Sequence, residues 1–238
     1  MQQGDGNISC FSEIRRSKCN FAGTESLITM RSKTEDSESG LALPLVEEFF
    51  SIQGEGYNAG EAAYFIRLGG CDICCSWCDS RFSWDPELFP PVATEKIVEN
   101  TLSSGAHTAV VTGGEPLMWN MEPLCGGLKK QNIKTCLETS GAYPLTGQWD
   151  WICLSPKRGM PPGGKICRKA HELKVVIETT DDFQWAQKYR ELVSRHCRLF
   201  LQPEWSRFES IIPEIVDYVR RNQEWKISLQ IHKYMHIP

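Results

Sequence analysis

A regular alternation of short apolar runs and amphipathic segments, beginning near residue 45, most constrains what this chain can fold into. Apolar runs bounded by Gly, Pro and polar residues predict strands, and segments with a 3.6-residue apolar period predict helices. The predicted strands span residues 62–70, 107–114, 133–141, 150–157, 171–178 and 198–205, and the predicted helices span residues 93–105, 121–132, 181–196 and 210–222. This order predicts an α/β fold in which helices cover a parallel sheet.

The number of strands leaves two architectures open. Six strands are too few for a closed eight-stranded barrel, whereas a partial, open barrel and an open doubly wound sheet both fit. Thr94 is expected to cap its helix, and Pro213 is tolerated in its helix if it lies in the first turn. Residues 226–238 are expected to form a final extended segment.

The first 44 residues differ from the rest of the chain. They are rich in Ser, Gly and charged residues, show no sustained apolar period and lack the apolar core of a secretory signal. We expect residues 1–44 to be a disordered extension. Residues 45–238 are long enough to form one large domain.

Charge and cysteine content exclude several classes of protein. The formal net charge is −4, so no basic field favours nucleic acid, and no apolar run is long enough to span a membrane. Four of the eleven cysteines are bunched and the others are scattered, which does not resemble the disulfide framework of a small secreted protein. We therefore expect a reducing compartment, the cytoplasm, and one site built from thiolates.

Polar residues that turns do not require follow most of the predicted strands. In parallel α/β folds the carboxyl ends of the strands meet at one rim, where ligands bind. The sequence therefore predicts one pocket to which several distant segments contribute side chains. The residues concerned are Thr112, Glu115, Glu138, Ser155, Lys157 and Gln202.

The bunched cysteines form the segment "CDICCSWC" (71–78), which allows three interpretations. A structural zinc site would want four ligands, commonly from two separated pairs, and adjacent Cys74 and Cys75 would have difficulty facing one metal. A redox pair made of Cys75 and Cys78 would leave Cys71 unexplained. Three thiolates from one loop, Cys71, Cys75 and Cys78, suit an iron–sulfur cluster with one open iron.

This C-x3-C-x2-C loop, with Trp77 before the last cysteine, resembles the signature of the radical S-adenosylmethionine superfamily, and "TGGEP" (112–116) resembles its GGE motif. Further segments narrow the match to the 7-carboxy-7-deazaguanine synthase family, which this chain resembles over about residues 45–238. These segments are "FFSIQGEG" (49–56), "FIRLGGC" (65–71), "CSWCDS" (75–80), "LETSG" (137–141), "DWICLSPK" (150–157), "ELKVVI" (172–177), "LQP" (201–203) and "SLQIHKYMHIP" (228–238). The resemblance implies a partial, open parallel β/α barrel of about six strands as the catalytic domain.

The resemblance also implies an activity. A [4Fe–4S] cluster would reduce S-adenosylmethionine to a 5′-deoxyadenosyl radical, which would take hydrogen from C6 of 6-carboxy-5,6,7,8-tetrahydropterin. Magnesium-assisted ring contraction and loss of ammonia would give 7-carboxy-7-deazaguanine. A homodimer and an unidentified electron donor are implied as partners. An activating enzyme of the glycyl-radical kind, which shares the cysteine spacing, and a non-catalytic zinc-binding module are the alternatives.

The resemblance assigns site residues as follows. The cluster would be held by Cys71, Cys75 and Cys78, with Cys74 not a ligand, and Mg²⁺ would be bound by the hydroxyl of Ser80. The S-adenosylmethionine site would comprise Trp77, Cys78, Asp79, Gly113, Gly114, Glu115, Glu138, Ser155, Pro156, Lys157, Gln202, Pro203, Glu204 and Trp205, with Glu115 accepting the cofactor's ammonium. The pterin site would comprise Ile52, Gln53, Gly54, Glu55, Arg67, Thr112, His232 and Pro238, with Arg67 binding the substrate carboxylate.

Overall fold

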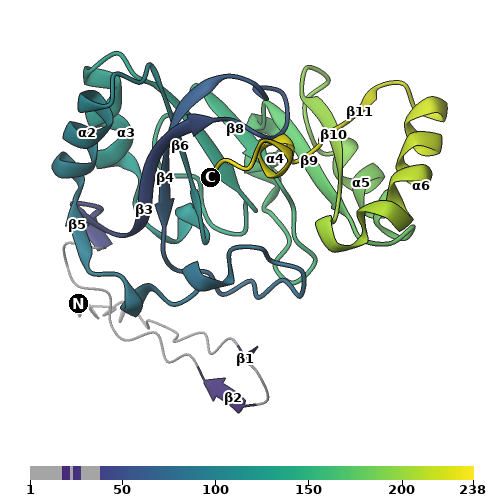
Figure 1. Cartoon of the computed structure of the whole chain (residues 1–238), viewed down its shortest axis with the longest axis horizontal. Coiled ribbons are helices and arrows are strands. Elements are labelled where there is room, and N and C mark those ends of the chain that lie inside the picture. The colour runs from purple at the N-terminus through teal and green to yellow at the C-terminus, as the bar shows by residue number, and fades with distance from the viewer. Residues whose placement is uncertain (1–17, 22–23, 28–37) are drawn as a thin grey trace, which may run out of the picture.

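The computed structural model describes residues 18–21, 24–27 and 38–238. Within residues 38–238 one nine-stranded sheet organises the chain, in the order β11-β10-β9-β8-β7-β6-β4-β3-β5 (Figure 1). Its parallel strands are β4 (Ala62–Leu68), β6 (Thr108–Gly113), β7 (Lys134–Thr139), β8 (Trp151–Leu154), β9 (Glu172–Ile177), β10 (Arg198–Pro203) and β11 (Trp225–Ile227). Strands β3 (Ala42–Ile52) and β5 (Pro91–Ala93) extend the sheet in antiparallel pairing.

The direction of winding decides between the two architectures. Successive parallel strands are always neighbours, whereas a doubly wound sheet reverses its direction at a switch point. The sheet ends at β11 on one side and β5 on the other, so the barrel is open. The prediction of a partial, open parallel barrel is confirmed, with seven parallel strands rather than about six in the part of the chain described.

Helices connect most of the parallel strands and cover one face of the sheet (Figure 1). They are α2 (Thr94–Ser103), α3 (Glu122–Lys130), α4 (Gly164–Lys169), α5 (Asp182–Arg190) and α6 (Phe208–Arg221), and α7 (Ile231–Met235) follows β11. Short 3-10 helices are η1 (Arg81–Ser83), η2 (Pro86–Leu88), η3 (Pro116–Met118) and η4 (Trp205–Arg207). No helix among the described residues is long and apolar enough to cross a membrane.

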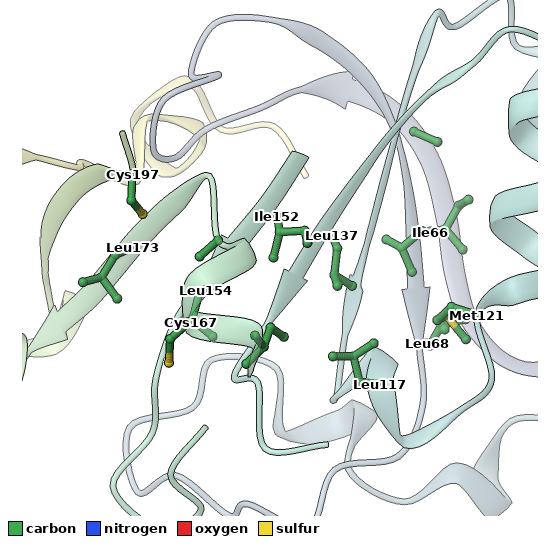
Figure 2. Close-up of a cluster of buried hydrophobic side chains, with 14 of the residues drawn as sticks. Ile66, Leu68, Leu117, Met121, Leu137, Ile152, Leu154, Cys167, Leu173 and Cys197 are labelled. Carbon is green, nitrogen blue, oxygen red and sulfur yellow. The ribbon is translucent and has the colours of Figure 1, made fainter. Parts of the chain in front are cut away.

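The two faces of the sheet differ because side chains alternate along each strand. Figure 2 shows the face packed under the helices, where Ile66, Leu137, Ile152 and Leu173 belong to one apolar core. Fully burying each such side chain contributes about 1.5–3 kcal/mol. The intervening positions, such as Arg67, point to the opposite face, which leaves that face free for polar side chains.

Several local predictions were wrong. Residues 226–238 do not form one extended segment, because β11 ends at Ile227 and the chain turns into α7, whose Ile231 amide donates to the Gly54 carbonyl at 2.9 Å. Ala93 holds the N-cap position of α2, and the Thr94 hydroxyl instead donates to the Gly40 carbonyl at 2.7 Å. Pro213 lies inside α6, beyond its first turn.

The ordered sheet begins slightly before the predicted domain boundary at residue 45, and the division into an extension and one catalytic domain stays a prediction. Strand β3 already begins at Ala42, and Leu43 pairs with Val92 of β5 and is fully buried. Strands β1 (Lys18–Phe21) and β2 (Thr24–Leu27) form a separate antiparallel pair. The remainder of the predicted extension, residues 1–17, 22–23 and 28–37, lies outside the described residues.

We predict that Leu43→Ala destabilises the domain although it lies within the segment expected to be disordered. Removing a fully buried leucine side chain costs about 2–5 kcal/mol, whereas Leu88→Ala, at a side chain 66% exposed, is the matched control with little effect. Anaerobic thermal unfolding of both variants measures the difference. Equal melting temperatures for the two would contradict the inclusion of residues 42–44 in the core.

Candidate active site

A cavity of about 540 Å³ lies on the face of the sheet opposite the helices. The carboxyl ends of the parallel strands and the C-terminal segment contribute to its lining. Every residue assigned above to the cluster, the cofactor, Mg²⁺ or the substrate lines this cavity except Pro156. The Pro156 carbonyl instead accepts a hydrogen bond from Trp185 Nε1 at 3.4 Å. The structure therefore brings together side chains that are far apart in the sequence.

Hydrogen bonds from two other segments hold the backbone at the start of the cysteine loop. The amides of Gly70 and Cys71 donate to the carbonyls of Ser83 and Trp84, at 2.8 and 3.0 Å. Trp119 Nε1 donates to the Gly69 carbonyl at 2.9 Å. Because three consecutive residues are bonded in this way, Cys71 is held in place just after the end of β4.

Three of the four cysteines in this loop line the cavity, namely Cys71, Cys75 and Cys78, and Cys74 is not among the lining residues. Burial, reinforced by the Glu115 carboxylate, raises the pKa of the Cys71 thiol to about 12, and burial also raises the pKa of Cys75. Ligation must therefore displace protons from these thiols. Three sulfurs from one loop fit an iron–sulfur cluster, in which each cysteine binds a different iron.

The glycines of "TGGEP" line the cavity and also allow two strand ends to pack closely. A Cβ on Gly113 would overlap the backbone of Leu68, and a Cβ on Gly114 would overlap the Gly70 carbonyl. Gly113 also has a φ of 123°, which side-chain-bearing residues rarely adopt. These glycines thus allow the end of β6 to touch the chain leading to Cys71, and their approach to the cofactor stays a prediction.

The Glu115 carboxylate is already bonded within the protein. It is 1% exposed and accepts hydrogen bonds from the Leu117 amide at 3.1 Å, the Ser140 amide at 2.8 Å and the hydroxyls of Thr139 and Ser140. These four donors match the roughly four lone-pair sites of a carboxylate. For Glu115 to accept a cofactor ammonium, one of the two hydroxyls would have to turn away.

The segment after β8 contributes a lysine that is held between two of the residues assigned to the cofactor site. Lys157 Nζ donates to Ser155 Oγ at 2.6 Å and lies 4.9 Å from the centre of the Trp77 ring. At the end of β10, two strands along the sheet, the Glu204 carboxylate caps η4 by accepting from the amides of Ser206 and Arg207, at 3.0 and 3.1 Å. These contacts fix the wall near the cysteine loop.

The C-terminal segment closes the far end of the cavity against the β3–β4 loop. His232 packs against Gly54 so closely that a Cβ there would overlap its ring, and Ser51 Oγ donates to the Pro238 carbonyl at 3.2 Å. Figure 1 shows the C-terminus in front of the sheet, where Pro238 lines the cavity. The last residues of the chain therefore form part of the binding site.

A buried group of charged side chains, centred on Lys174, lies between the cysteine-loop end and the C-terminal end of the cavity. Lys174 Nζ donates to Glu55 and lies 4.0 Å from Glu138 Oε1, and Gln53 Nε2 and Thr112 Oγ1 donate to Glu138 at 3.0 and 3.2 Å. Burial opposes ionisation of Glu55, but the neighbouring Lys174 ammonium and hydrogen bonds hold its pKa at about 2. Burial also opposes the charge on Lys174, yet Glu138 and Glu55 raise its pKa well above the usual value.

Arg67, predicted to bind a carboxylate, lines the cavity from β4. Its Nε donates to Glu47 Oε1 at 2.7 Å, and its side chain is 22% exposed. This bond involves only Nε of the guanidinium, so the planar group is oriented by Glu47 while it borders the cavity. An oriented guanidinium is suited to bind a carboxylate through two parallel hydrogen bonds.

The sequence analysis missed several residues that line the cavity. They are Phe49, Phe65, Ile73, Ser76, Arg81, Trp84, Thr139, Ser140, Cys153, Lys174, Val176, Ser206, Gln230 and Lys233. Lys174 had a detectable signal, because a lysine at the centre of an apolar strand is costly to bury unless it is paired. The others carry no comparable signal, since their role depends on which face of a strand or loop meets the cavity.

The open barrel and the three-cysteine loop define a radical S-adenosylmethionine enzyme with a [4Fe–4S] cluster. The model of the 4Fe-4S single cluster domain family matches residues 52–146. A 7-carboxy-7-deazaguanine synthase of Flavobacterium psychrophilum is 54% identical over 84% of this chain and 95% of the relative, and one of Synechocystis sp. is 45% identical over 82% and 93%.

The solved structure of QueE from Escherichia coli matches with a TM-score of 0.70 and 25% identity, covering 83% of this chain and 99% of that one. The coverage is nearly complete for each relative, so the similarity extends well beyond the cysteine loop. This chain belongs to the 7-carboxy-7-deazaguanine synthase family.

We predict that Gly113→Ala destabilises the protein by at least about 2 kcal/mol, because it forces a side chain into a left-handed backbone that already touches Leu68. Gly126→Ala is the matched control, since a Cβ at this position within α3 has open space around it. Alanine there stabilises the helix by about 0.5–1 kcal/mol. Anaerobic thermal unfolding compares the variants, and a Gly113→Ala protein as stable as Gly126→Ala would refute the packing argument.

Proposed function

We propose that this chain converts 6-carboxy-5,6,7,8-tetrahydropterin to 7-carboxy-7-deazaguanine with loss of ammonia. The observation that carries the proposal is that the cysteine loop and the C-terminal segment line the same cavity. A radical-generating centre and a small heterocycle would thus be held within reach of each other. Membership of the family supports the choice of substrate.

The residues around the cysteine loop suit the cofactors. Cys71, Cys75 and Cys78 would hold the cluster, and Trp77, Lys157 and the backbone at Gly114 would border S-adenosylmethionine. When bound, cluster and cofactor supply a carbon-centred radical able to remove a hydrogen atom from the C6 position of the pterin. The protein's own contribution is to position the substrate and to keep bulk water away from the reacting atoms.

The far end of the cavity suits a heterocycle that carries a carboxylate. Arg67 would bind the carboxylate, while Glu55, Gln53 and Thr112 offer acceptors and donors for the ring edges. His232 borders the same space, and burial lowers the pKa of its imidazole despite the nearby Glu55 carboxylate. The neutral form therefore prevails, with one nitrogen able to donate and one able to accept.

Mg²⁺ would be held with few protein ligands. Ser80 lines the cavity next to the cysteine loop, and its hydroxyl is a hard oxygen donor. The substrate carboxylate and water molecules would therefore complete the coordination, as is usual for Mg²⁺ sites that act on a bound substrate.

Family membership argues against the two alternatives considered from the sequence, a glycyl-radical activating enzyme and a non-catalytic zinc module. The cavity also favours a small substrate, because side chains of α7 and Pro238 are among those that line it. An external electron donor, a homodimer and the lack of nucleic-acid binding stay predictions. So does a cytoplasmic location.

The test of this proposal is turnover by the anaerobically reconstituted enzyme, with and without Mg²⁺. We expect 7-carboxy-7-deazaguanine and one equivalent of ammonia, with a clear fall in rate when Mg²⁺ is removed. Product analysis by mass spectrometry measures the outcome. Reductive cleavage of S-adenosylmethionine without consumption of the pterin would contradict the proposed substrate, although the chain would still act as a radical S-adenosylmethionine enzyme.

The adjacent cysteines allow a matched test of cluster ligation. We predict that Cys75→Ser loses most of the cluster iron and its visible absorbance, because a serine oxygen replaces one of three thiolates. Cys74→Ser should retain the cluster, because Cys74 is not among the residues that line the cavity. Iron and sulfide content of the two variants measures this, and loss of iron from Cys74→Ser would reverse the assignment.

A further inference from the structure

Lys174 is an ionisable residue of the cavity to which no function has yet been assigned. It lies within β9, and its side chain is 6% exposed. The side chain belongs to the polar face of the sheet and lines the cavity. Burial of an ammonium costs several kcal/mol unless paired charges compensate, so the position of Lys174 demands carboxylates nearby.

The carboxylates reach Lys174 from two other elements. Glu55 comes from the loop after β3 and accepts from Lys174, and Glu138 comes from β7, with Oε1 4.0 Å from the lysine Nζ. A further bond orients Glu55, because Gln230 Nε2 donates to its Oε1 at 2.8 Å. Lys174 therefore joins the β3–β4 loop and the C-terminal segment to the sheet.

The charges of this group do not cancel. One ammonium and two carboxylates leave one negative charge beside the cavity. Glu172 lies two residues away on β9, and burial, only partly offset by Lys174, raises its pKa, which favours the neutral form. The group therefore offers surplus hydrogen-bond acceptors to a ligand, while Arg67 offers donors from β4.

We propose that Lys174 is the positioning residue of the substrate site, where its ammonium holds Glu55 and Glu138 as oriented acceptors for an edge of the substrate rich in N–H groups. This inference rests on the function proposed above. It assigns the guanidine-like edge of that substrate to Glu55 and Glu138, while Arg67 binds the separate carboxylate. Lys174 acts through the two carboxylates and takes no part in the chemistry itself.

The proposal predicts that the substrate affinity of a Lys174 variant depends on pH. The groups around Lys174 and Glu55 determine the direction of the change. Lys174 is faced by Glu55, Glu138, Cys153 and Glu172, and Glu55 is also faced by His232. With Lys174 present the pKa of Glu55 is about 2, so Glu55 is ionised throughout the neutral range. Without the ammonium, burial is the largest remaining influence and raises the pKa. Glu55 then takes up a proton as the pH falls, and an acceptor is lost.

The experiment measures equilibrium binding of 6-carboxytetrahydropterin to the unreduced holoenzyme, where no turnover occurs. Calorimetry at pH 6, 7 and 8 compares the wild type with Lys174→Met and Lys174→Arg. We expect Lys174→Met to bind at least about tenfold more weakly at pH 8. Its affinity relative to the wild type should fall further towards pH 6, by up to about tenfold per pH unit. Lys174→Arg, which keeps the charge, should show the wild-type pH profile.

Lys226→Met is the matched control, because Lys226 is exposed on β11, and it should bind as the wild type does. Iron content and affinity for S-adenosylmethionine report whether each variant is folded. If Lys174→Met fails to fold, Lys174→Gln carries the same expectation. A wild-type affinity and pH profile in the neutral variant would overturn the role of Lys174 and leave the proposed function intact. A wild type that does not bind the pterin would overturn both.

Discussion

The close contact between the ends of β4 and β6 is the constraint on which the rest of the site depends. The amides of Gly114 and Glu115 donate to the carbonyls of Leu68 and Gly70, at 2.8 and 2.7 Å. Neither bond could form if side chains replaced the hydrogens of Gly113 and Gly114. This contact places Cys71 beside Glu115, whose carboxylate then binds the end of β7. The carboxyl ends of three strands are thus joined before any cofactor binds.

The two faces of the sheet have different roles. One packs against the helices and stabilises the fold, and the other carries the polar side chains of the candidate site. Alternate side chains of each strand pack under the helices, where leucine, isoleucine and valine dominate. The opposite face can therefore hold Lys174, Glu138 and Arg67, whose burial costs free energy that the apolar face offsets. These charges are paired, Lys174 with Glu55 and Glu138 and Arg67 with Glu47, which offsets part of the cost of burying them.

Much of the fold and of the cluster site could be predicted from the sequence alone. The strand pattern indicated the sheet, and the spacing of Cys71, Cys75 and Cys78 indicated the cluster because ligands from one loop must be close in sequence. The contribution of the C-terminal segment was predicted only through its resemblance to a family. Its shape was predicted wrongly, because the helix α7 forms where His232 and Ile231 meet Gly54, a contact between residues almost 180 positions apart.

The sequence by itself determined the elements whose causes are local: the alternation of strands and helices, the thiol loop and the glycines that permit close approach. Tertiary structure alone decided which side chains share the cavity, since that depends on strand register and winding. Lys174 shows the difference. As a letter in "ELKVVI" it is an isolated charge, and only the folded chain brings Glu55 and Glu138 to it, because the ion pairs join three elements separated along the chain.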